Sequence, residues 1–258
     1  MKPLVLVEEV EKSYRGRERR LKALDRVSLA LDRGEFVSVV GPSGCGKSTL
    51  MMLVAGLIPV TAGAIAIAGK PVGAPVTDLG IIFQRDALLE WRKVIDNVLL
   101  QIDIRRLPRR RYRASAVALL ARVGLTGFES YYPWELSGGM RQRVALCRAL
   151  IHDPSLLLMD EPFGALDALT REQMNLDLQS IWLENRKTVL FITHSISEAV
   201  FLSDRVIVMT PRPGRIAADI PIELSRPRRL AMRETDAFGS HVAAIRSQLQ
   251  AFGVLRED

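Results

Sequence analysis

A short apolar run leads directly into a glycine-rich loop, and this junction constrains the fold more than any other feature of the chain. The run is Phe36–Val40, and the loop that follows is Gly41-Pro42-Ser43-Gly44-Cys45-Gly46-Lys47-Ser48. An apolar run that ends in such a loop is typical of a central parallel strand feeding a helix. The sequence therefore predicts an α/β fold with a helix from about Lys47 to Leu57.

The loop has the composition of a cradle for phosphate groups. Glycines let backbone N–H groups turn inward around phosphate oxygens, and the following helix offers its positive N-terminal end to the same anion. Lys47 is expected to reach the β- and γ-phosphates, Ser48 to place its hydroxyl on Mg²⁺, and Thr49 to contact the α-phosphate. The predicted ATP-binding residues of this segment are Gly41, Pro42, Ser43, Gly44, Cys45, Gly46, Lys47, Ser48 and Thr49.

Two acids follow a second apolar run downstream. Leu156 to Met159 reads as a further parallel strand, and Asp160 and Glu161 come directly after it. A carboxylate at a strand end projects toward the phosphate loop and can hold Mg²⁺, here through water. The next acid, Glu161, is placed to polarise the attacking water.

Between the loop and the acid pair lies the segment Leu136-Ser137-Gly138-Gly139-Met140-Arg141-Gln142-Arg143. Its Ser-Gly-Gly element stands at the start of a predicted helix and offers a second surface that faces phosphate. One subunit cannot easily fold this surface onto its own phosphate loop. The pattern predicts a nucleotide held between two copies of the chain, with Ser137, Gly138 and Gly139 facing the phosphate of the other copy.

The remaining segments fit an α/β core with helices inserted into it. Strands are expected at residues 4–7, 23–31, 81–83, 188–193 and 205–209, and helical spacing replaces strand signals from about 91 to 149. A helix near the end is indicated by Phe238, Val242, Ile245 and Leu249. The uncharged stretch 48–69 reads as a helix, a turn and a strand, because Gly56, Pro59 and Gly63 interrupt it. With a strand-like N-terminus and no signal peptide, the chain is expected to be soluble.

The charge is basic and unevenly spread. The formal net charge of the 258 residues is +7, and arginines crowd residues 105–113. Aromatic residues do not interleave with them apart from Tyr112, so no nucleic-acid role is expected, whereas a face near anionic lipids is plausible. The two cysteines show no metal-binding spacing and are expected to be reduced thiols.

These motifs resemble those of the ATP-binding subunit of an ABC transporter, over roughly Leu4 to Ile216. The resemblance implies a P-loop NTPase (RecA-like) core with an antiparallel β subdomain and an inserted α-helical subdomain. The implied domains are 1–90 with 150–216 for the ATP-binding core, 91–149 for the helical subdomain that carries the signature motif, and 217–258 for a partly helical C-terminal tail. It also implies ATPase activity that depends on ATP and Mg²⁺.

The same resemblance gives roles to single residues. It makes Glu161 the general base, and Gln84 a residue that touches Mg²⁺ and water and leads into the surface that meets the membrane partner. It makes His194 the switch residue that bonds the γ-phosphate, and Asp167 a bridge between the two subunits. Tyr14 is the candidate for stacking on adenine. Together with Ser48 and Asp160, Gln84 forms the implied Mg²⁺ set. Most of the family has Gln at the position of Met140. The departure from Gln seen in this chain is common in importers.

Within importers, four stretches look like the nitrate, sulfonate and taurine branch: residues 83–91, 96–98, 160–167 and 208–216. The implied function is uptake of a small solute such as sulfonate, taurine or nitrate, or of a pyrimidine precursor of thiamine. The implied partners are integral membrane permease subunits, a second copy of the ATPase and a separate solute-binding protein, at the cytoplasmic face of the inner membrane.

Two other classes of function use part of the same pattern. A soluble ABC ATPase of Fe–S assembly or DNA maintenance shares the motifs, but the interval between loop and signature is too short for the long coiled coil of DNA-repair members. A small-molecule kinase leaves Leu136 to Arg143 unexplained. The solute itself is not encoded in this chain, because specificity in importers lies in the binding protein and the permease.

Overall fold

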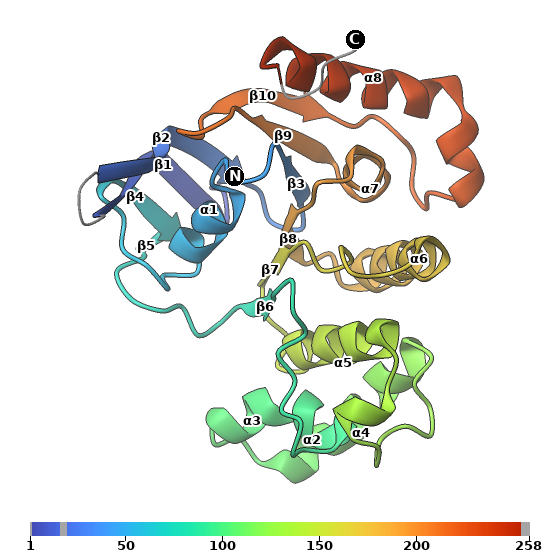
Figure 1. The fold of residues 1–258 in the computed structure, drawn as a ribbon. Coiled ribbons are helices and arrows are strands. Elements are labelled where there is room, and N and C mark those ends of the chain that lie inside the picture. Colours follow the sequence, from blue (N-terminus) through green and yellow to red (C-terminus); the bar gives the residue numbers. More distant parts are fainter. Residues whose placement is uncertain (1, 16–19, 254–258) are drawn as a thin grey trace. The chain divides into compact units, whose positions relative to one another are not determined.

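The computed structural model describes residues 2–15 and 20–253, and the chain folds into two compact units. The first comprises Met1–Thr77 and Trp182–Asp258, and the second comprises Asp78–Ile181 (Figure 1). Among the described residues, no helix combines the length and apolar character needed to span a bilayer.

The first unit contains an antiparallel sheet with the strand order β2-β1-β4-β5. Its strands are β1 Val5–Arg15, β2 Arg20–Leu31, β4 Ala62–Ile67 and β5 Lys70–Pro71. In register, Val5 lies opposite Leu31 of β2 and Ile67 of β4. Val5, Val7 and Val10 are buried along β1, so one face of the sheet contributes to the core. The strand expected at the end of the stretch 48–69 is β4, and the antiparallel pairing of this sheet confirms the expected antiparallel subdomain.

A second sheet of this unit supports the glycine loop. Strand β3 Phe36–Val40 pairs in parallel with β8 Thr188–Ile192 on one side and β9 Arg205–Met209 on the other. Every residue of β3 and of β8 is buried. Burial on both faces explains why these strands are near-continuous apolar runs in the sequence. The helix α1 Lys47–Val54 follows β3, and α7 Ile196–Leu202 follows β8.

The edge strand β10 Ile216–Pro221 was not predicted from the sequence. It pairs antiparallel with β9, and its residues are half-buried or exposed. An edge strand with little burial needs no strong apolar pattern, so the signal fades at Ile216 although the sheet continues.

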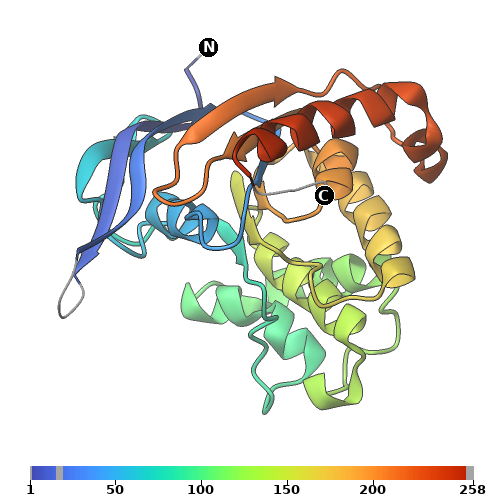
Figure 2. The ribbon, with the colours of Figure 1, turned by 45° about the horizontal axis from the view of Figure 1, so that its top comes forward.

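The last helix lies on this sheet of the first unit. The helix α8 Asp236–Ala251 follows the short 3₁₀ helix Leu230–Glu234 and packs on α7, β9 and β10 (Figure 2). Phe238, Ile245 and Leu249 are buried as expected, while Val242 is half-buried. Thr235 begins the helix, and its hydroxyl accepts a bond from the Phe238 N–H at 3.4 Å.

A buried arginine connects this C-terminal segment to the core of the first unit. Arg228 is 2% exposed, and its guanidinium donates to five backbone carbonyls. Burial lowers its pKa to about 10. The shortest bonds reach the end of α7, and the acceptors are the carbonyl oxygens of Val200 (2.7 Å), Phe201 (3.1 Å), Ser203 (2.7 Å), Leu224 (3.2 Å) and Ile222 (3.4 Å).

The second unit joins a pair of strands to a group of helices. Strand β6 Gly80–Ile82 pairs in parallel with β7 Leu156–Asp160. The other elements are α2 Val94–Val98, α3 Leu100–Ile104, α4 Arg109–Arg122, the 3₁₀ helix Pro133–Glu135, α5 Gly138–Leu150 and the first part of α6 Ala168–Asn185.

On α5 and at its C-terminal end, Val144, Cys147 and Ile151 are buried, and Met140 is half-buried. Burial raises the pKa of the Cys147 thiol to about 12. The domain bounds expected from the sequence remain a prediction. Residues 1, 16–19 and 254–258 of those segments lie outside the described part of the chain.

We predict that Arg228→Ala lowers the free energy of unfolding by about 3 kcal/mol, because it removes a buried side chain and leaves several buried carbonyls without a donor. Urea unfolding of the full chain measures this. The control is Arg246→Ala, which removes an exposed arginine of α8. Equal midpoints for the two variants would contradict the account of Arg228.

Candidate functional site

The glycine loop lies between β3 and α1 in the first unit. Gly44 has φ 72° and Gly46 has φ 108°, both in the left-handed region that favours glycine. A Cβ on Gly46 would lie 2.6 Å from Leu24 Cδ2, whereas a Cβ on Gly44 would meet no atom within 4 Å. The loop is therefore tightly packed on one side and open at Gly44, where an anion can approach the backbone.

Lys47 is held inside this loop. Its side chain is buried, and Nζ donates to the carbonyl oxygens of Gly41 at 2.9 Å and Pro42 at 3.1 Å. These bonds hold the ammonium group against the backbone of the loop. A positive charge there meets the phosphate groups that the open backbone can accept.

The other predicted residues of the loop differ in what they can offer. Ser48 is exposed at the start of α1, so its hydroxyl is available as an oxygen ligand. Cys45 is buried, and burial raises the pKa of its thiol against the opposing charge of Lys47. Cys45 therefore reaches a ligand through its backbone alone.

Tyr14 lies beside the same helix. Its hydroxyl is 3.4 Å from Thr49 Oγ1, and its ring is 37% exposed. Lys12 Nζ lies 5.2 Å from the ring centroid and donates to the Pro59 carbonyl at 2.6 Å. The structure thus brings the predicted stacking residue next to the predicted phosphate loop. Lys12 was not predicted to belong to the site. Its only sequence signal was its position on β1, two residues before Tyr14.

His194 follows β8 in the first unit, and its side chain is exposed. The residues on either side of it are fixed: Thr193 Oγ1 donates to Glu198 Oε2 at 2.6 Å, and the Ser195 N–H donates to Thr193 Oγ1 at 3.0 Å. Ser195 also accepts from the Glu198 N–H at 3.3 Å and so begins α7. The imidazole is therefore presented from a rigid turn.

In the second unit, the acid pair marks the end of β7. Asp160 is the last residue of the strand, and Glu161 has φ 45°, a conformation that strains residues other than glycine. The Glu161 carbonyl accepts from the Gly164 N–H at 3.1 Å. A strained backbone held by its surroundings is typical of functional residues. Both side chains are partly buried.

The Ser-Gly-Gly element forms the beginning of α5, as predicted. The Ser137 hydroxyl accepts from the Met140 N–H at 3.3 Å, and both Ser137 and Gly138 are exposed. A Cβ on Gly138 would meet no atom within 4 Å, whereas one on Gly139 would lie 2.6 Å from Thr170 Cγ2. Gly138 is therefore open to a ligand, and Gly139 is also needed for close packing on α6, which the sequence did not reveal.

Asp167 lies at the start of α6. Its Oδ1 accepts from the Thr170 N–H at 3.0 Å, and hydrogen bonding to Thr170 lowers the pKa of its exposed carboxyl. Within one chain, Asp167 thus caps a helix, and its bridging role stays a prediction.

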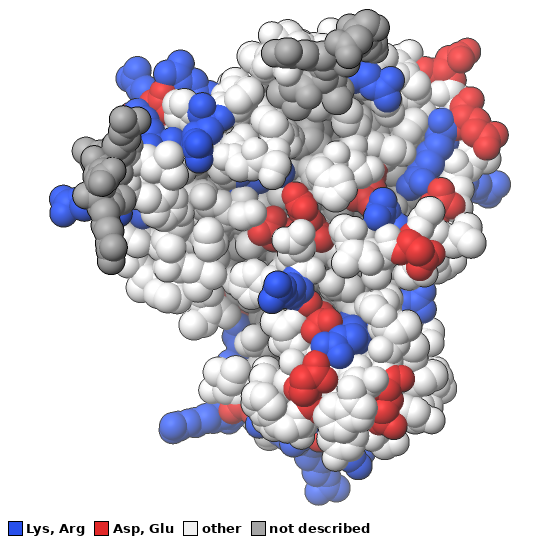
Figure 3. Space-filling model, in the orientation of Figure 1, with Lys and Arg blue, Asp and Glu red and all other residues white. Residues whose placement is uncertain are grey.

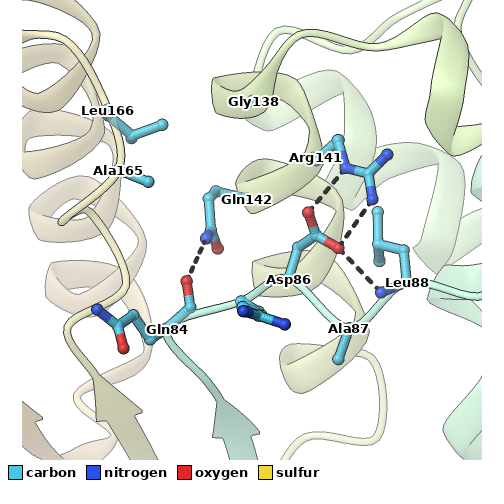
Figure 4. Close-up of a pocket in the computed structure, with 10 residues that line it drawn as sticks. Gln84, Asp86, Ala87, Leu88, Gly138, Arg141, Gln142, Ala165 and Leu166 are labelled. Carbon is cyan, nitrogen blue, oxygen red and sulfur yellow. Dashed lines mark hydrogen bonds and ion pairs between the residues drawn. The ribbon is translucent and has the colours of Figure 1, made fainter.

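A pocket of about 410 Å³ lies within the second unit between the segment after β6 and the helix α5 (Figure 4). Gln142 Nε2 donates to the Gln84 carbonyl at 3.3 Å, and Arg141 Nε donates to Asp86 Oδ2 at 2.7 Å. Arg141 Nη2 also reaches Glu90 Oε1 at 2.6 Å. The segment that carries Gln84 is therefore bound to the helix that begins at Ser137.

The charges in this pocket support one another. Burial alone would raise the pKa of the Asp86 carboxyl, but the hydrogen bonds from Arg141 and the Leu88 N–H, together with the charges of Arg141 and Arg148, outweigh it, so the pKa is lowered. Arg148 adds bonds to the backbone oxygens of Asp86 at 2.6 Å and Ala87 at 2.7 Å. Asp86, Arg141 and Gln142 lie within the motifs of the sequence, but no role was predicted for them. The opposite charges of Asp86 and Arg141 were the signal that could have been used.

The donor set fits Mg²⁺ bound together with a phosphate. Among the residues that the structure describes, no group of three or more His, Cys, Asp or Glu side chains could hold a metal ion by itself. The predicted ligands are oxygen donors, with Ser48 in the first unit and Gln84 and Asp160 in the second. Mg²⁺ prefers this chemistry, with one or two carboxylates and the remaining positions filled by phosphate and water.

Comparison with known proteins agrees with this geometry. The profile of the family described as ABC transporter matches residues 24–164. The chain belongs to the ABC transporter family. It is an ABC-type ATPase with a P-loop NTPase fold, so the resemblance and the fold class inferred from the motifs are confirmed.

The chain is also similar to individual proteins and solved structures of this family. The chain is 52% identical to the taurine import ATP-binding protein TauB of Rhizobium johnstonii, over 81% of this chain and 79% of that protein. It is 47% identical to an uncharacterised ABC transporter ATP-binding protein of Methanocaldococcus jannaschii, over 88% and 85% of the two chains. A dimeric bacterial ABC transporter cassette superposes with a TM-score of 0.76 at 31% identity, covering 86% of this chain and all of that one. A dimeric post-hydrolysis state of that cassette, bound to ADP and Pi, gives 0.75.

We predict that Lys47→Ala weakens ATP binding by about 10- to 100-fold, since it removes a charged hydrogen-bond donor from the loop. Titration with a fluorescent ATP analogue measures the affinity, and circular dichroism checks the fold. Lys70→Ala, which removes an exposed lysine of β5, is the matched control. Unchanged affinity in Lys47→Ala would mean that the loop does not hold the phosphates.

Proposed function

We propose that this ABC-type ATPase is the energy-coupling subunit of a membrane importer for a small anion such as taurine, another sulfonate or nitrate. The observation that carries the proposal is the open beginning of α5, where Ser137 and Gly138 are exposed and free of neighbouring atoms at the Gly138 Cβ position. A chain with its own phosphate loop has use for this second anion-binding helix end only if another copy supplies the nucleotide. Similarity to a solved dimeric cassette supports the pairing.

The residues of the first unit bind the nucleotide in this proposal. The open backbone of residues 41–46 and the ammonium of Lys47 hold the β- and γ-phosphates. Tyr14 stacks on the adenine, since its half-exposed ring lies beside Thr49 at the start of α1. His194 bonds the γ-phosphate from the rigid turn before α7.

The residues of the second unit carry the hydrolytic chemistry. Glu161 acts as the general base for the attacking water. Gln84 and Asp160, together with Ser48 of the first unit, would hold Mg²⁺, which when bound would neutralise charge on the phosphate oxygens. Asp167 contacts the second copy from the start of α6.

The pocket of the second unit relays the state of the nucleotide. Because Asp86 and Gln84 are bound to Arg141 and Gln142, a shift of Gln84 displaces α5 and with it Ser137. The same segment leads into the surface that meets the permease. This arrangement couples closure of the dimer to the membrane partner.

The substrate class rests on the relatives. Proteins named as taurine import ATP-binding protein TauB match at 52% identity in Rhizobium johnstonii and 47% in Yersinia pestis. By this similarity the chain works at the cytoplasmic face of the inner membrane with permease subunits and a separate solute-binding protein. A thiamine-pyrimidine precursor is the alternative solute within the same branch.

The importer role is tested by purifying the native complex from membranes through a tag on this chain. We expect an integral membrane permease and a solute-binding protein to accompany it, and mass spectrometry of the bound ligand to find a small anion. Recovery with Fe–S assembly or DNA-maintenance proteins, and without a permease, would contradict the importer role and support a soluble ABC ATPase.

We predict that Glu161→Gln keeps ATP binding but lowers hydrolysis by about 10²- to 10⁴-fold, because it removes the base and keeps the size of the side chain. Phosphate release measures the rate, and size-exclusion chromatography with ATP follows the trapped dimer. Glu223→Gln, at an exposed position, is the control. Turnover above about a tenth of the wild-type rate would refute Glu161 as the base, given that expected loss.

A further inference from the structure

The second unit carries a cluster of exposed arginines that the proposed function does not use. It lies at the turn between α3 and α4 and in the first turns of α4, and consists of Arg106, Arg110, Arg111 and Arg113. All four are exposed, and none of their side chains makes a hydrogen bond or ion pair with the part of the chain that the structure describes. Figure 3 shows basic side chains at this end of the unit.

The acids near this basic patch are already paired with other arginines. Asp103 accepts from Arg92 at 2.8 Å, and Asp96 is paired with Arg109. Arg109 therefore lies on the paired side of α4, while the four arginines of the patch keep their full charge toward solvent. No described acidic residue neutralises them.

The charges of the patch are unfavourable for the helix that carries them. The helix α4 has no acidic residue in its first turn and no side-chain cap, yet its first turn is basic. Cations near the positive N-terminal end of a helix are unfavourable. Unpaired cations at this end of a helix, without acidic partners that would offset the cost, are typical of a surface used for binding.

Apolar side chains flank the charges. Ile104, at the end of α3, is 66% exposed, and Leu107 in the turn is 36% exposed. Arg106 lies between them with φ 54°, a conformation that strains residues other than glycine. Aliphatic groups beside unpaired guanidinium groups suit the boundary between lipid headgroups and acyl chains.

We propose that this basic patch binds directly to the anionic phospholipid surface of the membrane. The guanidinium groups meet headgroup phosphates, and Ile104 and Leu107 enter the boundary beneath them. This goes beyond the proposed function, in which the ATPase reaches the membrane only through its permease. Nucleic acid fits less well, because Tyr112 is the only aromatic residue among these arginines and is half-buried.

The test is co-sedimentation of the full chain with vesicles of phosphatidylcholine alone or of an equal mixture with phosphatidylglycerol. We expect binding to the mixed vesicles only, and its loss at about 1 M salt, where the Debye length is about 3 Å. Changing Arg106, Arg110, Arg111 and Arg113 to Gln should weaken binding by roughly 600-fold, since each basic residue near such a surface contributes about fivefold.

The matched control changes Arg33, Lys70, Arg212 and Arg246 to Gln. These positions are exposed in the first unit, and removing four charges lowers the formal net charge from +7 to +3 in both variants. The control should bind the mixed vesicles like the wild type. Both variants should keep their ATPase activity, so failure of this proposal is distinct from failure of the transport role.

Three results would overturn the proposal. The patch variant could bind like the wild type, or the control could lose as much binding as the patch variant, which would make the effect one of net charge. The wild type could also bind poly-glutamate but not the mixed vesicles, which would indicate an acidic protein partner.

A second variant tests the apolar part of the surface. Ile104→Ser combined with Leu107→Ser should weaken vesicle binding while keeping the salt dependence of that binding.

Discussion

The hydrogen bonds from Lys47 Nζ to the Gly41 and Pro42 carbonyls hold together the element on which the rest of the structure depends. They close a loop whose backbone is left open to an anion at Gly44. The loop can be this exposed only because it is anchored at both ends, by a strand buried along its whole length and by α1. The surrounding parallel strands, and the turn that presents His194, serve to keep this backbone in place.

The second unit is organised around a different anchor. The ion pair of Arg141 with Asp86 joins the segment after β6 to α5, and Gln142 adds a bond to the Gln84 carbonyl. A partly buried charge pair is sensitive to geometry. If the partners separate, each charge stays partly buried without its counter-charge, which costs free energy. The segment around Gln84 is thus bonded to the helix that begins at Ser137. In the proposed cycle this links nucleotide sensing to the surface that meets the second copy.

Much of this was predictable because local chemistry and position coincide. The glycine loop, the strand before the acid pair and the helix starting at Ser137 each have a fixed short-range pattern, and the structure places them as expected. The strand β10 was missed because an edge strand with little burial carries little apolar signal. The packing of Gly139 against Thr170 and the bonds of Arg228 to the end of α7 were missed for another reason. Both depend on contacts between segments far apart in the chain, which no local pattern encodes.

The central claim is that each nucleotide is completed by the helix end of the other copy. A mixed dimer with Ser137→Arg in one subunit and Lys47→Ala in the other tests it directly, with separate affinity tags and Glu161→Gln in both subunits to prevent turnover. The account predicts one trapped ATP per mixed dimer, because one composite site carries both lesions and the other carries neither. If the mixed dimer traps no ATP, as expected when each lesion damages its own subunit's site, the shared site is wrong.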